Sequence, residues 1–209
     1  MFGHRPRPAF RPTRRAVIAI IVVGMFAGAA LLLSFCVGSP GYYREKYSAA
    51  GPANPTSRAG VPRPEHQVEP HTCGFHAMAS LYRAYGLDPE ALRLRFRLGV
   101  DKPFTNLLPD SRGTIHPDML RVLDQDGFTV TSIDPQDAAS AQRLAAHLDS
   151  GQLAIALIRV SELHWVVIAA RREDQLIICD SLKESTYEEA AGPYLTDRAY
   201  SLLLIRPRN

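Results

Sequence analysis

An uncharged run of 22 residues near the N-terminus, Ala16–Val37, divides the chain into two unlike parts. As an α-helix this run rises roughly 33 Å, enough to cross a hydrocarbon core of about 30 Å. A cleaved signal peptide is the alternative, but the apolar region of a signal peptide spans only about 7 to 15 residues. The length of the run therefore predicts one transmembrane helix that precedes a water-exposed domain.

The residues before this run predict its orientation. Residues 1–15 form a basic tail with five arginines and no acidic residue. Because Lys and Arg collect on the cytoplasmic side of membranes, we expect a cytoplasmic N-terminus and a domain outside the cell membrane, periplasmic or extracellular. Gly24 and Gly28 form a small-xxx-small spacing that would let two such helices pack closely, so the sequence also allows a weak dimer.

The basic character of the chain belongs to this tail. The whole sequence has 24 basic and 21 acidic residues, and without the five tail arginines it has 19 basic residues and a formal net charge of −2. Nucleic acid is therefore not expected as a partner. The three cysteines, one of them inside the apolar run, give no disulfide framework, so the domain is expected to be stabilised by its core.

Residues 38–65 are dense in Pro, Gly, Ala and Ser and lack apolar periodicity, which predicts an extended linker. The folded domain is expected over residues 66–209. Helical apolar spacing in its first half predicts helices over 73–85, 88–98, 117–126 and 138–148, with a strand at 128–133.

After Gly151 the sequence changes to short runs rich in Val and Ile. These runs predict antiparallel strands at 153–159, 163–170, 175–180 and 200–205. The order of elements predicts an α+β fold, in which a helical half packs on an antiparallel sheet.

Cys73 stands where a polar loop passes into the first of these helices. Unpaired amides and the positive end of the helix dipole favour thiolate, the form that attacks a carbonyl carbon. A small buried hydrophobic residue is the structural alternative for a lone cysteine at this place.

His164 and Asp180 lie on two predicted strands joined by a charged segment, residues 171–174. If the hairpin is centred on Arg172, His164 lies directly opposite Asp180 on one face of the sheet. The carboxylate would then orient the imidazole and leave its other nitrogen to exchange a proton with sulfur. Taken singly, a hydrogen-bonded core histidine and a turn-forming aspartate explain these residues equally well.

Gln67 lies six residues before Cys73, and its side-chain amide, with the Cys73 backbone amide, would stabilise an oxyanion. A zinc site built on His71, Cys73 and His76 is a further alternative. Zinc sites usually combine two close pairs of ligands, so we expect neither a metal nor another cofactor. Cys179 alternates with Asp180 along its strand and is expected to point into the core.

The segment from Gln67 to Ile205 resembles the papain-like, bacteriocin-processing cysteine peptidases, family thirty-nine of the cysteine peptidases, which cleave after double-glycine leaders. The matching features are Gln67 before Cys73, the Cys73-Gly74 step opening Ala77-Met78-Ala79-Ser80-Leu81, Gly113-Thr114 before a helix, and His164-Trp165-Val166-Val167 followed by Asp180.

The resemblance implies a papain-like fold and a peptide or protein substrate. It also implies roles at the active site: Cys73 as nucleophile, His164 as general base and acid, Asp180 as the orienting residue and Gln67 as an oxyanion-hole donor. Phe75 and Ser181 depart from the pattern, because many relatives have proline at these two positions.

We therefore expect a membrane-anchored cysteine peptidase that hydrolyses peptide bonds through an acyl-enzyme thioester. The alternative from another class is a noncatalytic papain-like envelope protein that binds a peptide in the same cleft. The position of two side chains discriminates between them, because His164 and Asp180 on opposite faces of the sheet would favour the noncatalytic protein.

Overall fold

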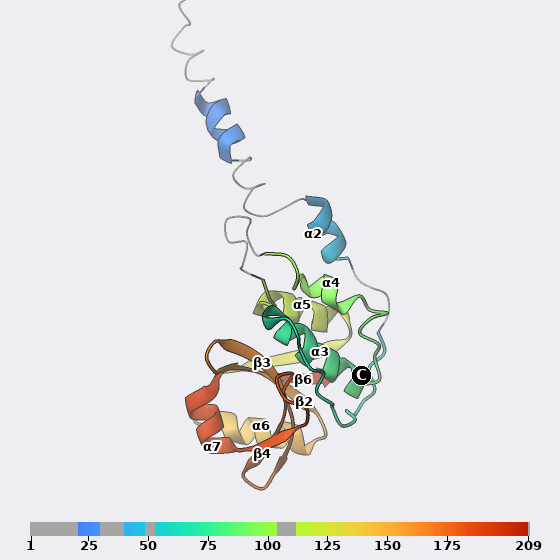
Figure 1. Ribbon diagram of the computed structural model, residues 1–209, viewed down its shortest axis with the longest axis vertical. Coiled ribbons are helices and arrows are strands. Elements are labelled where there is room, and N and C mark those ends of the chain that lie inside the picture. Colours follow the sequence, from blue (N-terminus) through green and yellow to red (C-terminus); the bar gives the residue numbers. More distant parts are fainter. Residues whose placement is uncertain (1–20, 30–39, 49–52, 104–111, 209) are drawn as a thin grey trace, which may run out of the picture.

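A computed structural model describes residues 21–29, 40–48, 53–103 and 112–208 (Figure 1). Within these ranges the centre of the molecule is an antiparallel sheet with the strand order β1-β6-β2-β3-β4-β5. Its strands are β1 (Phe128–Ile133), β2 (Leu153–Arg159), β3 (Leu163–Arg172), β4 (Gln175–Cys179), β5 (Tyr187–Ala190) and β6 (Ala199–Pro207).

Helices cover both faces of this sheet (Figure 1). They are α2 (Pro40–Lys46), η1 (Pro70–Thr72), α3 (Cys73–Ala84), α4 (Leu94–Leu98), α5 (His116–Gln125), α6 (Ser140–Asp149), α7 (Ala191–Pro193) and the π-helical segment η2 (Tyr194–Arg198). The first face carries α3 on β3 and α5 on β1, whereas α6 packs on β2 and β3 from the second face.

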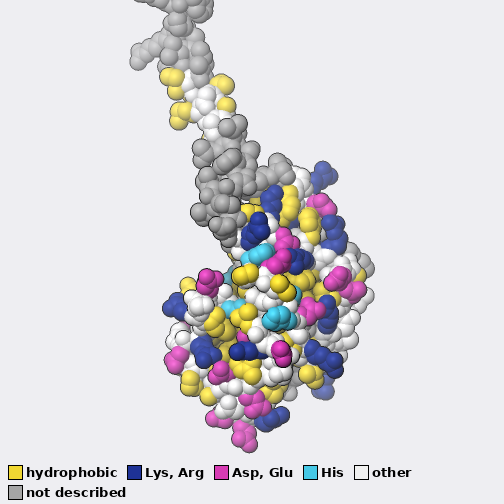
Figure 2. Space-filling view, in the orientation of Figure 1, with side chains coloured by type: hydrophobic (Ala, Val, Ile, Leu, Met, Phe, Trp, Pro, Cys, Tyr) yellow, Lys and Arg dark blue, Asp and Glu magenta, His cyan; other side chains and the backbone are white. Residues whose placement is uncertain are grey.

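The sequence of β2 shows why both faces are buried. Leu153, Ile155 and Leu157 point into the core shared with α3, and the residues between them point into the core shared with α6. Side chains alternate along a strand, so an unbroken apolar run buries two faces rather than one. Charged side chains of both signs are interspersed over the visible surface of the domain, as its nearly balanced composition leads one to expect (Figure 2).

Most predicted elements are present. The strands predicted at 128–133 and 153–159 have the observed bounds, but β5 was missed because its sequence, Tyr-Glu-Glu-Ala, has no apolar run. The second helix is shorter than predicted. The Asp88 carboxylate accepts hydrogen bonds from the amides of Glu90 and Ala91, but Arg93 has a left-handed φ of 51°, so the regular helix begins only at Leu94.

The prediction of an extended linker over residues 38–65 misses helix α2, whereas residues 53–65 have no regular secondary structure, as that prediction expects. Residues 40–46 form α2, whose Lys46 ammonium group lies 2.6 Å from the Asp118 carboxylate in a buried ion pair. Further along, Thr56 and Gly60 donate backbone hydrogen bonds to the end of α3. Pro and Gly lower the helical propensity of a segment, but they do not prevent it from packing on a neighbouring surface.

Residues 21–29 are helical, with Val23, Met25 and Phe26 exposed at 67%, 70% and 74%. The basic tail at 1–15 and the remainder of the predicted span, residues 16–20 and 30–37, lie outside the described residues. In the described ranges, no helix has both the length and the apolar character that a membrane span needs. The transmembrane helix and its dimer stay predictions.

We expect Lys46→Met to lower the free energy of unfolding by about 2 kcal/mol, because it removes one cation from a buried carboxylate. Chemical denaturation of the full-length protein measures this change. Glu45→Gln is the matched control: the Glu45–Arg93 ion pair is more than half exposed, and its loss should change stability by less than about 0.5 kcal/mol. Equal stability of Lys46→Met and wild type would show that the ion pair does not hold α2 on the domain.

Candidate active site

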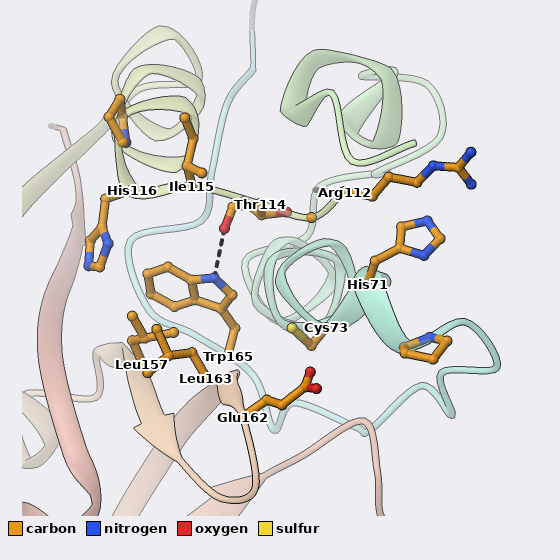
Figure 3. A pocket seen from close by; sticks show the side chains of 13 residues that line it. His71, Cys73, Arg112, Thr114, Ile115, His116, Leu157, Glu162, Leu163 and Trp165 are labelled. Atoms are coloured by element: carbon orange, nitrogen blue, oxygen red, sulfur yellow. Dashed lines mark hydrogen bonds between the residues drawn. The ribbon is translucent and has the colours of Figure 1, made fainter. Parts of the chain in front are cut away.

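A cleft of about 550 Å³ opens at the N-terminus of α3 (Figure 3). Its walls come from the η1 turn, the loop before α5 and the start of β3. The residues that line it are Pro70, His71, Cys73, Arg112, Gly113, Thr114, Ile115, His116, Pro117, Leu157, Glu162, Leu163 and Trp165. Cys73 is therefore buried in the domain, at 9% exposure, yet borders a cleft open to solvent.

The start of α3 is braced against the loop before α5. A Cβ atom on Gly74 would lie 2.4 Å from Cβ of Thr114, so glycine permits the close approach of helix and loop. The indole Nε1 of Trp165 donates a hydrogen bond of 3.0 Å to the Thr114 carbonyl oxygen (Figure 3). This contact joins β3 to the same loop, and together the two contacts fix the cleft wall beside Cys73.

The predicted contact between His164 and Asp180 is present. His164 Nε2 lies 2.7 Å from Asp180 Oδ1, and both residues are buried at 4% exposure. Two more groups orient the carboxylate: the Leu182 backbone amide donates to Oδ1 at 2.9 Å, and the Tyr187 hydroxyl donates to Oδ2 at 3.4 Å. Tyr187 belongs to β5 and was missed with that strand.

The strands reach this contact in a different register from the predicted one. The hairpin closes on Glu173-Asp174, because Arg172 pairs with Gln175. A bulge between Ile168 and Ala170 then shifts the register by one residue, so that Val167 pairs with Cys179. In the shifted register His164 and Asp180 share one face as diagonal neighbours; without the bulge they would lie on opposite faces.

Burial lowers the pKa of the His164 imidazole, but hydrogen bonds to Asp180 and Cys73 outweigh burial and raise it to about 9. Burial also raises the pKa of the Asp180 carboxyl, and its hydrogen bonds to His164 and the Leu182 amide more than offset that effect and hold it below its ordinary value. At neutral pH His164 is therefore protonated and Asp180 ionised. The stabilisation that protonated His164 gives the fold is complete below pH 6.5 and is lost as the pH rises through about 9.

Gln67 lies beside the Asp180 loop rather than free in solvent. Its backbone amide donates to the Ser181 carbonyl oxygen at 3.0 Å, and the Ser181 hydroxyl donates to the Gln67 side-chain oxygen at 2.6 Å. Because the side-chain oxygen already accepts this bond, the amide NH₂ is the end left to meet another group. Ser181, one of the two departures from the resembled pattern, thus orients Gln67.

The two histidines of the zinc alternative, His71 and His76, pair with different carboxylates. His71 Nε2 lies 3.5 Å from an Asp101 oxygen, and His76 Nδ1 lies 3.5 Å from a Glu65 oxygen. Among the described residues, the one group with metal-ligand spacing is Glu69, His71 and Asp101, which excludes Cys73 and is occupied by the Arg95 guanidinium, 2.6 Å from both carboxylates.

Cys179, the second cysteine in the described ranges, lies in the core at 3% exposure. Burial raises the pKa of its thiol to about 11. Its position on β4 predicted this placement. The two thiols therefore differ in surroundings, because only Cys73 borders the cleft.

Comparison with solved structures shows the fold of peptidase family C39. The chain matches the peptidase domain of Streptococcus ComA, a bifunctional ABC transporter of a quorum-sensing pathway, with a TM-score of 0.51 and 19% identity over 71% of this chain and 98% of that domain. It matches a double-glycine-motif protease from an AMS/PCAT transporter, solved with its leader peptide, with a TM-score of 0.51 and 18% identity over 73% and 97% of the two chains.

A third match is a protein from Bacillus anthracis described as a C39-like peptidase, with a TM-score of 0.53 and 11% identity over 75% of this chain and all of that one. No family model and no curated protein matches the sequence. At these identities the comparisons establish the fold, as the resemblance implied. The roles of the site residues are inferred from their geometry and chemistry.

We expect Asp180→Asn to lower the pKa of His164 from about 9 towards its ordinary value of 6.5, because the variant loses the anionic hydrogen-bond acceptor. NMR titration of the labelled histidine rings measures the shift. His147 is the internal control: it bonds the Leu153 carbonyl oxygen at 2.9 Å, away from the cleft, and its titration should be unchanged. A His164 pKa that stays near 9 in the variant would show that Asp180 is not the group that raises it.

Proposed function

We propose that this chain is a cysteine peptidase that hydrolyses peptide bonds through Cys73, His164 and Asp180. The observation that carries the proposal is the buried 2.7 Å contact between His164 and Asp180, beside a cysteine that opens a helix at a cleft. A protonated imidazole and a helix N-terminus both favour thiolate at Cys73.

In the proposed reaction the Cys73 thiolate attacks the carbonyl carbon of a peptide bond. His164 Nε2 is engaged by Asp180, so Nδ1 is the nitrogen left to pass its proton to the leaving amine. The C–N bond breaks and an acyl-enzyme thioester forms. Water then attacks the thioester, gives up a proton to His164 and releases the acid, which regenerates the thiolate.

The oxyanion formed in each step needs hydrogen-bond donors. We assign this role to the backbone amide of Cys73 and the side-chain NH₂ of Gln67. The hydrogen bond from Ser181 to the Gln67 oxygen supports the assignment, because it orients the amide with its donor end free. One such donor contributes about 2.7 to 4 kcal/mol to the stability of the transition state.

Two of the structures with the same fold are peptidase domains, and one of them was solved with a leader peptide. These neighbours support a peptide or protein as the substrate class. The noncatalytic alternative would be favoured if His164 and Asp180 lay on opposite faces of the sheet. His164 and Asp180 share one sheet face, which favours the enzyme.

Iodoacetamide should modify Cys73 rapidly at neutral pH, because its thiol borders the open cleft beside protonated His164. Mass spectrometry of tryptic peptides from the full-length protein measures the rate. Cys179 is the internal control and should react far more slowly, since burial raises its pKa to about 11.

The Cys73→Ala variant should keep its fold and lose all labelling by an electrophilic peptide library, which also reports substrate preference. A Cys73 no more reactive than the same thiol in the denatured chain would contradict the proposed nucleophile.

We further propose that residues 16–37 anchor the chain in a cell membrane, with the N-terminus cytoplasmic and the domain outside. The support is the uncharged run itself, the arginines before it, and the exposed apolar side chains of helical residues 21–29.

A phosphatase reporter fused after Asn209, active only outside the cytoplasm, should be active in the full-length chain. A β-galactosidase fusion at the same place is the opposite control. Activity of the second reporter alone would reverse the proposed topology.

A further inference from the structure

We propose that Glu162 gives the cleft a preference for peptides with a basic side chain, Lys or Arg, next to the bond that is cleaved. This inference rests on the proposed peptidase function and adds a substrate class to it. It comes from three features of the cleft: an unpaired carboxylate, an apolar wall beneath it, and a positive charge on the other wall.

The first feature is the carboxylate itself. Glu162 lies in the turn between β2 and β3, two residues before His164, and its carbonyl oxygen accepts a 3.0 Å hydrogen bond from the Val160 amide. Figure 3 shows its side chain directed into the cleft near Cys73. Within the part of the chain that the structure describes, no cation or hydrogen-bond donor pairs with this carboxylate. Its charge is thus available to a ligand that enters the cleft.

The second feature is the apolar surface around Glu162. Leu157, Leu163 and Trp165 line the same cleft, and Leu163 follows Glu162 directly in the chain. Lys and Arg carry three or four methylene groups below their charge, which pack on apolar surface while the charged head stays polar. Trp165, at 3% exposure, is held in place by its bond to Thr114 and forms the fixed base of this surface, and Leu163, at 51%, is its accessible side chain.

The third feature is a positive charge on the opposite wall of the cleft. Arg112 lines it from the loop before α5, and Figure 3 shows Arg112 and Glu162 on either side of Cys73. Arg112 has no ion pair with any residue in the described ranges. Besides Cys73, the other titratable residues that line the cleft are His71, paired with Asp101, and His116, 2.7 Å from the Ser201 hydroxyl.

Among the lining residues, Glu162 is therefore the carboxylate that meets a ligand, and Arg112 repels a basic side chain from the opposite wall. Glu162 is exposed, and a solvent-exposed charge pair changes binding by a few-fold rather than by orders of magnitude. We expect kcat/KM for a Lys peptide to exceed that for its Gln counterpart by about threefold to tenfold at low salt. The ratio should fall as ionic strength rises, because salt screens the pair.

The test uses fluorogenic peptides that differ in a single Lys or Gln, placed on either side of the cleaved bond, with the full-length protein. Glu162→Gln should bring the Lys/Gln ratio of kcat/KM close to one, and Glu162→Lys should invert it. The control is Glu173→Gln, a carboxylate in the turn at the far end of β3, which should leave the ratio unchanged. A ratio in Glu162→Gln equal to that of wild type overturns the proposal.

A binding experiment separates this inference from the peptidase function. The Cys73→Ala variant, with and without Glu162→Gln, is titrated with the same two peptides by fluorescence anisotropy. Selective binding of the Lys peptide that depends on Glu162 supports the inference even if wild type cleaves neither peptide, a result that would reject the peptidase function alone. Equal affinity for both peptides overturns the role of Glu162 whether or not cleavage occurs.

Discussion

The buried contact between His164 and Asp180 depends on how β3 and β4 pair. The two residues stand at the ends of their strands, where a change of one residue in register would turn one side chain to the other face. The bulge between Ile168 and Ala170 makes the shift that puts both on one face. The charge state of the cleft follows from this local irregularity, because the pKa of His164 is raised by the carboxylate that the bulge brings near it.

The helical half of the domain is held to this sheet edge by close packing. Gly74 lets α3 approach Thr114, and Trp165 on β3 bonds the same loop. The elements that carry Cys73 and His164 are therefore both packed on the loop at Thr114. This rigid packing matters for a thiol site because the sulfur and imidazole must keep hydrogen-bonding distance while a substrate binds.

Helix α2, which follows the apolar run, packs on the domain although the composition of its segment predicts a linker. Lys46 on α2 pairs with Asp118 on α5, and α5 begins directly after the loop that forms one wall of the cleft. If residues 16–37 lie in a membrane, α2 is the element through which the anchor meets the domain.

The sequence alone determined the α+β class, the bounds of β1 and β2, and the contact of His164 with Asp180, because apolar periodicity and the chemistry of His and Asp are local properties of the chain. It did not determine the register that brings His164 to Asp180, the part played by Ser181 and Tyr187, or the docking of α2. It also gave no sign that Glu162 lines the same cleft as Cys73. Each of these depends on contacts between segments far apart in the chain, and such contacts exist only once the sheet has paired and the helices have packed on it.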